Sequence, residues 1–271
     1  MIDFVRTVFS YGFMARAFIA GSLISVCAAL LGTTLVLKRY SMIGDGLSHV
    51  GFGTMAIALA FNLAPLAVSI PVCVLAAFLL LRVSASSGIK GDAAIALISS
   101  SSLAIGILVT SATSGLNTDV TSFMFGSILA ISRADVAVSV ALAAAVIGLY
   151  TAFYNRIFLV TFDEAFATAA GIRASAYNAL TAVLTAVTIV VGMRLMGAMM
   201  ISSLIVFPAL SAMRVFHSFR KVAAAAVALS VLCFAAGITA SFALSVPAGA
   251  SIVAANLAAF LLCTAAGRLL R

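Results

Sequence analysis

Long apolar stretches, separated by short polar or glycine- and proline-containing segments, fill the chain from end to end. About 20 apolar residues in a helix cross the ~30 Å hydrocarbon core of a bilayer. The pattern therefore predicts an all-α, polytopic membrane helix bundle within a single domain, residues 1–271, with about nine spans, or eight and a re-entrant piece. The predicted spans are 17–37, 42–63, 66–82, 93–112, 136–154, 174–193, 197–213, 222–245 and 249–267.

Three segments do not fit a simple span. Residues 1–16 begin with apolar side chains on one helical face, which predicts an interfacial amphipathic lead-in. Residues 113–132 contain an apolar stretch, Phe123–Ile131, that is too short to cross and is expected to fold back into the bundle. Residues 157–173 hold adjacent acidic residues and then a short alanine-rich helix that is expected to end at Gly171.

Composition and charge agree with a membrane protein. Only 8% of the residues are charged and 65% are hydrophobic, whereas a soluble domain carries about 25% charged residues. The net charge of +8 is expected from basic residues in cytoplasmic loops, and without a run of five basic residues it does not indicate nucleic acid.

The distribution of lysine and arginine predicts the orientation. If the loop at Lys38–Arg39 is cytoplasmic, eleven of the 15 basic residues lie on that side and only four, Arg6, Arg16, Arg133 and Arg194, on the other. This positive-inside bias places the N-terminus outside, the C-terminus in the cytoplasm, and residues 157–173 in the cytoplasm.

Ionisable side chains are rare within the predicted spans, and Asp45 and His49 are the exceptions. Their i, i+4 spacing places both on one helical face, with Ser48 beside them. A carboxylate in hydrocarbon costs at least a few kcal/mol, so this face should meet protein or water. Carboxylate oxygen and imidazole nitrogen are ligands for Zn²⁺, Mn²⁺ or Fe²⁺. The alternative is an ion pair of Asp45 with Arg39 and a histidine bonded to a neighbouring carbonyl.

Other kinds of chemistry find little support. No G-x-x-x-x-G-K-[ST] phosphate loop is present, so this chain does not bind ATP by that route. The four cysteines lack a C-x-x-C spacing, and no Ser/His/Asp arrangement is plausible. The hydroxyls of residues 99–102, Ser100 among them, are weak evidence for a polar pathway.

Five stretches of the sequence resemble the integral-membrane permeases of bacterial ABC importers for zinc, manganese and iron. They are LKRYSMIGDGLSHVGFGTMAIA at 37–58, TDVTSFMFGSILAISRADV at 118–136, FDEAFATAAGI at 162–172, GAMMISSLIVFPALSAMR at 197–214 and VPAGASIV at 246–253. The resemblance covers nearly the whole chain, and the first stretch is its most specific part.

The resemblance implies the function and the partners. It implies a homodimeric permease in the bacterial inner membrane, with a separate cytoplasmic ABC ATPase and an extracytoplasmic metal-binding protein. The permease itself would be no enzyme and would hold no permanent cofactor. Its substrate would be a divalent transition metal, zinc first, with manganese or iron as the other candidates.

The resemblance also implies roles for particular residues. The metal pathway of the family corresponds to Asp45 and His49, with Ser48 and Ser100 as possible further members. Some members of the family have another histidine where this sequence has Ser100, which changes the ligand set. The ATPase-coupling helix corresponds to Asp163, Glu164, Ala167 and Gly171, with Ala167 expected on the docking face.

An outer gate is predicted from the residues between the fourth and fifth spans. Asn117, Asp119 and Asp135 are expected to face the side from which a binding protein delivers metal. The alternative is an ordinary loop whose acidic residues pair with Arg133.

Two other functions remain open from the sequence. A cobalamin or siderophore importer permease would carry a much larger ligand and would not need an Asp/His pair. A proton-coupled secondary transporter would use Asp45 as its proton site, although no convincing internal repeat supports it. Dependence of transport on ATP and on a partner ATPase distinguishes the secondary transporter from an importer.

Overall fold

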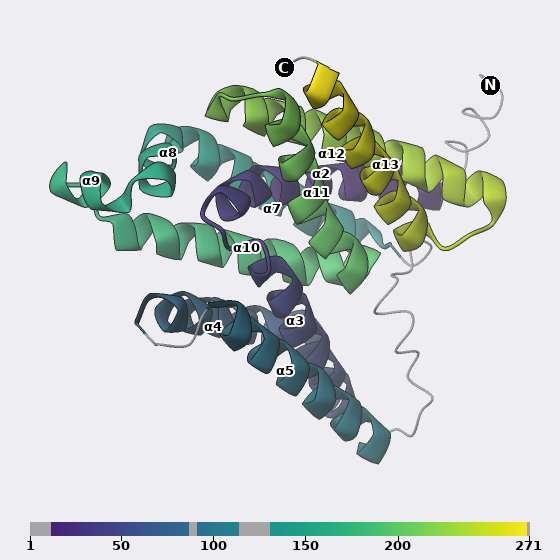
Figure 1. The fold of residues 1–271 in the computed structure, drawn as a ribbon. Helices are drawn as coiled ribbons and strands as arrows, with labels where there is room; N and C mark the ends of the chain where they lie inside the picture. The colour runs from purple at the N-terminus through teal and green to yellow at the C-terminus, as the bar shows by residue number, and fades with distance from the viewer. Residues whose placement is uncertain (1–11, 87–90, 114–130, 270–271) are drawn as a thin grey trace.

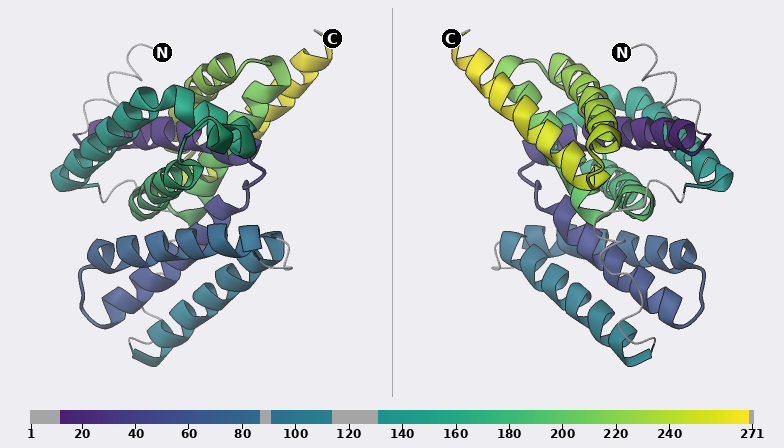
Figure 2. Two further views of the ribbon diagram at one scale, coloured as in Figure 1. Left: turned by 90° about the vertical axis from the view of Figure 1, so that its left-hand side faces the viewer. Right: turned by 90° about the vertical axis from the view of Figure 1, so that its right-hand side faces the viewer.

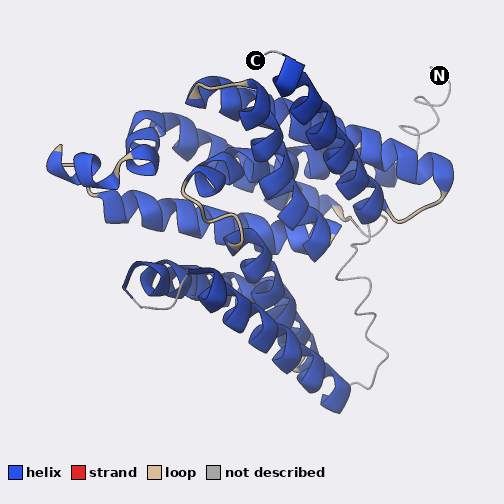
Figure 3. Cartoon of the chain, in the orientation of Figure 1, coloured by secondary structure: helices blue, strands red, loops and turns tan. Residues whose placement is uncertain are grey.

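The computed structural model describes residues 12–86, 91–113 and 131–269, and all regular structure in these ranges is helical (Figures 1 and 3). The helices are α2 (Gly12–Leu37), α3 (Ile43–Ala60), α4 (Pro65–Ser86), α5 (Gly91–Thr113), α7 (Arg133–Ala152), α8 (Tyr154–Phe162), α9 (Glu164–Ala169), α10 (Ala174–Met196), α11 (Ala198–Val215), α12 (Phe219–Leu244) and α13 (Ala248–Leu269).

The predicted all-α membrane bundle is confirmed. Each of the nine predicted spans overlaps one helix. Within the described ranges, eight helices are long and apolar enough to cross a membrane, and α3 is the one predicted span outside this set. This helix has only 18 residues and includes Asp45 and His49, so the polar side chains that make it a candidate site also weaken its signal as a span.

The helices form two groups, which Figure 2 shows from two sides. Helices α3, α4 and α5 contact one another and form a three-helix unit. Helices α2, α7, α10, α11, α12 and α13 form a larger bundle, from which α10 and α11 contact the three-helix unit. Helices α3 and α4 both contact the larger bundle, α3 through α10 and α11 and α4 through α10.

Burial is concentrated in the central helices. About two thirds of the membrane-crossing part of α2 and α10 is buried (67% and 72%), compared with 17% for α13 and 22% for α5. Large apolar side chains on the peripheral helices are exposed, including Leu75, Leu97 and Leu262. Such surfaces suit lipid, which is as apolar as leucine.

The two ends of the bundle collect different charged groups. Arg16 donates from Nε to the carbonyl oxygen of Ile131 (2.9 Å), close to the start of α7, where Asp135 pairs with Arg194 (3.5 Å). At the other end Lys38 pairs with Glu164 (3.5 Å). The helix ends that meet in each of these contacts are ones that alternating spans would put on the same side of a membrane.

Two predicted boundaries are wrong. The lead-in 1–16 extends too far, because residues 12–16 already belong to α2, while residues 1–11 lie outside the described residues. The coupling segment 157–173 contains parts of two helices instead of one, because Asp163 has an extended backbone (φ −147°, ψ 94°) that ends α8 and caps α9. Most of segment 113–132, including the expected fold-back at 123–130, also lies outside the described residues.

Glycines allow α3 to approach its neighbours closely. A Cβ on Gly53 would clash with the backbone carbonyl oxygen of Ser102 in α5, and a Cβ on Gly106 would lie 2.7 Å from the Cα of Gly53. Small residues let helix backbones come this close in membrane proteins. Helix α3 is continuous from Ile43 to Ala60, so these glycines serve close packing and not an unwound helix.

We expect Gly53→Ala to separate α3 from α5 and destabilise the protein. Overpacking typically costs about 1–3 kcal/mol, and the backbone of Ser102 has little freedom to move aside. The matched control is Gly148→Ala in α7, where an added Cβ meets nothing within 4 Å. Thermal unfolding of the purified proteins in detergent measures the difference. Equal midpoints for the two variants would contradict this account of the α3–α5 contact.

Candidate functional site

Asp45 and His49 lie side by side near the start of α3. Asp45 is in the first helical turn, where the partial positive charge of the helix N-terminus favours a carboxylate. The distance from Asp45 Oδ2 to His49 Nε2 is 3.7 Å. Among the described residues, Asp45 pairs with His49. The alternative considered from the sequence was an ion pair of Asp45 with Arg39.

The surroundings of the pair are partly polar. Ser48 is buried, donates to the carbonyl oxygen of Asp45 (2.7 Å), and has its hydroxyl oxygen 3.4 Å from that of Ser202 in α11. The side chains of Asp45 and His49 are 47% and 24% exposed. The two side chains are therefore partly accessible from outside this chain, whereas Ser48 next to them is buried.

The spacing of the two donor atoms suits one metal ion. Ligand bonds of oxygen or nitrogen to Zn²⁺ are about 2.0–2.2 Å long, so two donors on one ion lie at most about 4.4 Å apart. The observed 3.7 Å is within this limit. Within the described ranges, however, no group of three or more His, Cys, Asp or Glu side chains is placed to hold a metal. The described part of one chain thus offers two candidate ligands here, fewer than a closed metal site needs.

Ser100 lies apart from this pair within one chain. The residues of α5 that approach α3 include Ile95 and Ser102, next to Gly46 and Gly53. At 3.6 residues per turn, Ser100 points roughly 140–160° away from both of them, and it is exposed. The structure does not bring this predicted pathway residue to Asp45 and His49.

Local sequence signals shape the coupling segment. Asp163 Oδ1 accepts from the backbone N–H of Phe166 (2.8 Å) and caps α9. Gly171 has a φ of +81°, a conformation that glycine adopts without strain. Its N–H donates to Thr168 O (3.0 Å), and the N–H of Ile172 donates to Ala167 O (2.9 Å). This is a Schellman motif, and it confirms Gly171 as the stop of the short helix.

The prediction for Ala167 is wrong. Its side chain is fully buried in a small apolar cluster with Val160 and Ala174, so it does not lie on a docking face. The exposed large apolar side chains of this segment are Phe158, Phe162 and Phe166, and Phe162 and Phe166 are the most exposed of them (58% and 59%). Figure 1 shows α9 projecting from the bundle at one end of α10.

Glu164 is bound to its own chain. Its carboxylate pairs with Lys38 (3.5 Å) and accepts from Nδ2 of Asn178 (3.0 Å). The contacts of Lys38 and Asn178 with Glu164 were not predicted, because from the sequence Lys38 is only a basic residue that helps to orient the chain. No local pattern signals a contact between residues 140 positions apart.

The predicted outer gate is only partly within the described residues. Asn117 and Asp119 lie outside them. Asp135 forms a capping box with Ser132, accepting from its N–H (3.0 Å) and hydroxyl (2.7 Å). It also pairs with Arg194, and not with Arg133 as the sequence alternative supposed. The Asp135 carboxylate thus has a structural role at the start of α7, and its part in an outer gate stays a prediction.

The fold and the apolar helices define a multi-pass membrane protein, and comparison with known proteins gives its family. The sequence profile of the ABC 3 transport family matches residues 10–267. The chain therefore belongs to this family of transporter permeases, and it is a permease subunit and not itself an enzyme. This membership confirms the resemblance and argues against the secondary-transporter alternative.

Relatives with related names cover nearly the whole chain. A "Probable metal transport system membrane protein" of Treponema pallidum is 32% identical over 88% of this chain and 90% of its own length. The "Manganese import system permease protein ScaB" of Streptococcus gordonii is 27% identical over 96% and 93%. A "Probable iron transport system membrane protein" of Haemophilus influenzae is 29% identical over 96% and 92%.

Solved structures agree with the fold. A chain of "PsaBC from Streptococcus pneumoniae in complex with Fab" superposes with a TM-score of 0.87 at 27% identity, covering 97% of this chain and 95% of that chain. A "putative metal-chelate type ABC transporter" in an inward-facing conformation has a TM-score of 0.76 at 14% identity, covering 92% and 85%. The second likeness concerns the fold alone.

We expect Asp135→Ala to lower stability without abolishing transport by the folded protein. The change removes the capping box and the partner of Arg194, which together contribute about 1–2 kcal/mol. Arg133→Ala is the matched control, since exposed substitutions usually stay within about 0.5 kcal/mol. Thermal unfolding and metal uptake of the same preparations measure both effects. Loss of uptake at unchanged stability would instead restore Asp135 as a gate residue.

Proposed function

We propose that this chain is the membrane permease of an ATP-driven importer that passes a divalent transition metal to the cytoplasm between Asp45 and His49. The observation that carries the proposal is the 3.7 Å donor pair on the open side of α3, in a member of a family whose relatives are named as metal transport proteins. Hydrocarbon excludes charge, so a paired carboxylate and imidazole in a span favour an ion pathway.

The proposal includes a second copy of the chain. Two ligands are too few for a tetrahedral ion, and both side chains are partly accessible from outside their own chain. A homodimer with its two-fold axis along the pathway would bring two pairs together and supply four ligands. Such a site has to bind weakly enough to release the ion, because conduction needs both entry and exit.

The proposed cargo is manganese or iron, ahead of the zinc that the sequence favoured. Carboxylate oxygen suits Mn²⁺, and imidazole suits Fe²⁺ and Zn²⁺. The names of the relatives include manganese and iron, which moves these two ions forward. A cobalamin or siderophore permease is the less suited alternative, since a large ligand needs no such pair.

The proposed partners act at opposite ends of the bundle. Segment 154–172 docks on the cytoplasmic ABC ATPase through Phe162 and Phe166 and not through Ala167. An extracytoplasmic metal-binding protein delivers the ion at the end marked by Asp135 and Arg194. The eleven-to-four distribution of basic residues supports this orientation in a bacterial inner membrane, with the N-terminus outside and the C-terminus in the cytoplasm.

We expect Asp45→Ala and His49→Ala each to reduce metal uptake at least about tenfold. Groups that only support a metal ligand already contribute about 10- to 100-fold to affinity or activity, and these residues would be the ligands. Uptake of Mn²⁺, Fe²⁺ and Zn²⁺ is measured one ion at a time, in vesicles that contain the permease with its ATPase.

The matched control is His217→Ala, because His217 is the other histidine of the chain and lies exposed between α11 and α12. It should transport at the native rate. Native uptake by either α3 variant, with the ATPase still bound, would refute the proposed pathway. Failure to require ATP would refute the importer.

A further inference from the structure

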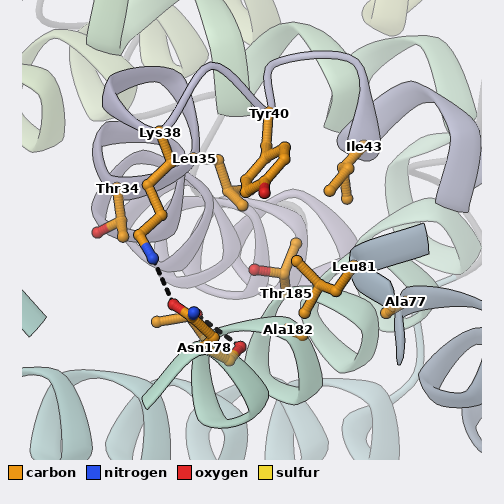
Figure 4. A pocket seen from close by; sticks show the side chains of 11 residues that line it. Thr34, Leu35, Lys38, Tyr40, Ile43, Ala77, Leu81, Asn178, Ala182 and Thr185 are labelled. Atoms are coloured by element: carbon orange, nitrogen blue, oxygen red, sulfur yellow. Dashed lines mark hydrogen bonds between the residues drawn. The ribbon is translucent and has the colours of Figure 1, made fainter. Parts of the chain in front are cut away.

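A closed ring of polar contacts joins the coupling segment to the end of α2. Lys38 pairs with Oε2 of Glu164 (3.5 Å) and donates a hydrogen bond to Oδ1 of Asn178. Asn178 completes the ring by donating from Nδ2 to Oε1 of Glu164 (3.0 Å). Figure 4 shows the Lys38 ammonium pointing from α2 across to Asn178 on α10. Three segments that are distant in the sequence thus meet in one network, which we call the Lys38 ring.

The charged end of Lys38 in this ring is buried and depends on its polar partners. The side chain of Lys38 is only 11% exposed, whereas that of Glu164 is 56% exposed. Burial lowers the pKa of the Lys38 ammonium, and the nearby Glu164 carboxylate partly offsets this shift. A buried ammonium without its partner is strongly destabilised, so the contact with Glu164 ties Lys38 to the start of α9.

Lys38 begins the loop that connects α2 to α3. Lys38 follows the last residue of α2, and Arg39 takes a left-handed conformation (φ 63°) that is uncommon for a residue other than glycine. Tyr40 and Ile43 then line a small cavity of about 20 Å³ between α2, α4 and α10 (Figure 4). This cavity has room for about one water, so the loop between α2 and α3 packs closely against α4 and α10.

The loop leads directly into the helix that carries the candidate metal pair. Helix α3 starts at Ile43, and Asp45 is in its first turn. Glu164, conversely, is the first residue of α9. Only six residues lie between Lys38 and Asp45 in the sequence, so a displacement at α9 has a short, closely packed route to the pair.

We propose that Lys38 is the positioning residue that couples movement of α9 to the start of α3. This inference rests on the proposed function and gives Glu164 a different task from direct contact with the ATPase. Phe162 and Phe166 meet the partner, Glu164 transmits the displacement of α9, and Lys38 carries it into the loop before Asp45. The ring thereby links ATP hydrolysis to opening of the metal path.

Lys38→Met is the variant that tests this inference most cleanly. It removes the buried charge and keeps most of the apolar stem, while the exposed Glu164 stays solvated. The permease is reconstituted with its ATPase and supplied with the metal-loaded binding protein, and metal uptake and ATP hydrolysis are measured together. We expect the ATPase to stay bound and hydrolysis to continue, while uptake per ATP falls about tenfold, within the usual range of coupling between sites.

Three further variants separate coupling from a structural role. Lys38→Arg keeps the charge and should restore uptake per ATP. Lys221→Met is the matched control, because Lys221 is an exposed lysine at the start of α12, and it should leave the ratio unchanged. Glu164→Gln combined with Lys38→Met should be no worse than Lys38→Met alone, because residues that act through one contact do not add.

An unchanged ratio of uptake to hydrolysis in Lys38→Met would overturn the inference. So would a fall in uptake and hydrolysis together with lost ATPase binding that Lys38→Arg does not restore, since this is the outcome of a purely structural contact. The proposed function is judged separately. If Asp45→Ala abolishes uptake while Lys38→Met couples normally, the metal path stands and the Lys38 ring is excluded as its coupling element.

Discussion

Hydrocarbon provides no partner for a charge or for an unpaired backbone group, and the arrangement of this permease follows from that constraint. Helices satisfy their backbone groups internally, so the described regular structure is all helical. Charged side chains pair at the helix ends, Lys38 with Glu164 at one end and Asp135 with Arg194 at the other. Asp45 and His49 lie inside a predicted span, and the same constraint requires them to face protein, water or an ion.

The constraint also explains why α3 differs from its neighbours. A helix with an aspartate and a histidine gains less from lipid than an apolar one, so it depends on contacts with other helices. Glycines provide these contacts by bringing α3 close to α5, and Ser48 adds a polar contact to α11. The helix is thus held on several sides while its ionisable pair stays partly exposed. We regard this combination of a firmly held helix and an open donor pair as the basis of the metal path.

Much of the fold could be predicted from the sequence, because hydrophobic runs and helix-ending residues act locally. Each of the nine predicted spans overlaps a helix, and Gly171 ends the short helix α9 as predicted. The placement of Asp45 and His49 on one helical face could be predicted for the same reason, since residues i and i+4 share a face in any helix.

Contacts between distant segments were beyond the reach of the sequence. The burial of Ala167 depends on how α8 and α10 fold around it, and no neighbouring residue in the sequence signals this packing. The ion pair of Asp135 with Arg194 joins two helices that are distant in the sequence. Its cap with Ser132, by contrast, is a local contact three residues away. The Lys38 ring requires the end of α2 and the start of α10 to meet, which no periodicity encodes.

The central claim is that Asp45 and His49 from two copies of the chain bind the transported ion. Metal binding to the assembled permease and ATPase tests it most directly, measured by equilibrium dialysis against saturating Mn²⁺, Fe²⁺ or Zn²⁺. The account predicts one ion per two permease chains in the native protein and in His217→Ala, and none in the variant that combines Asp45→Ala and His49→Ala. An unchanged metal content in that combined variant would contradict the account.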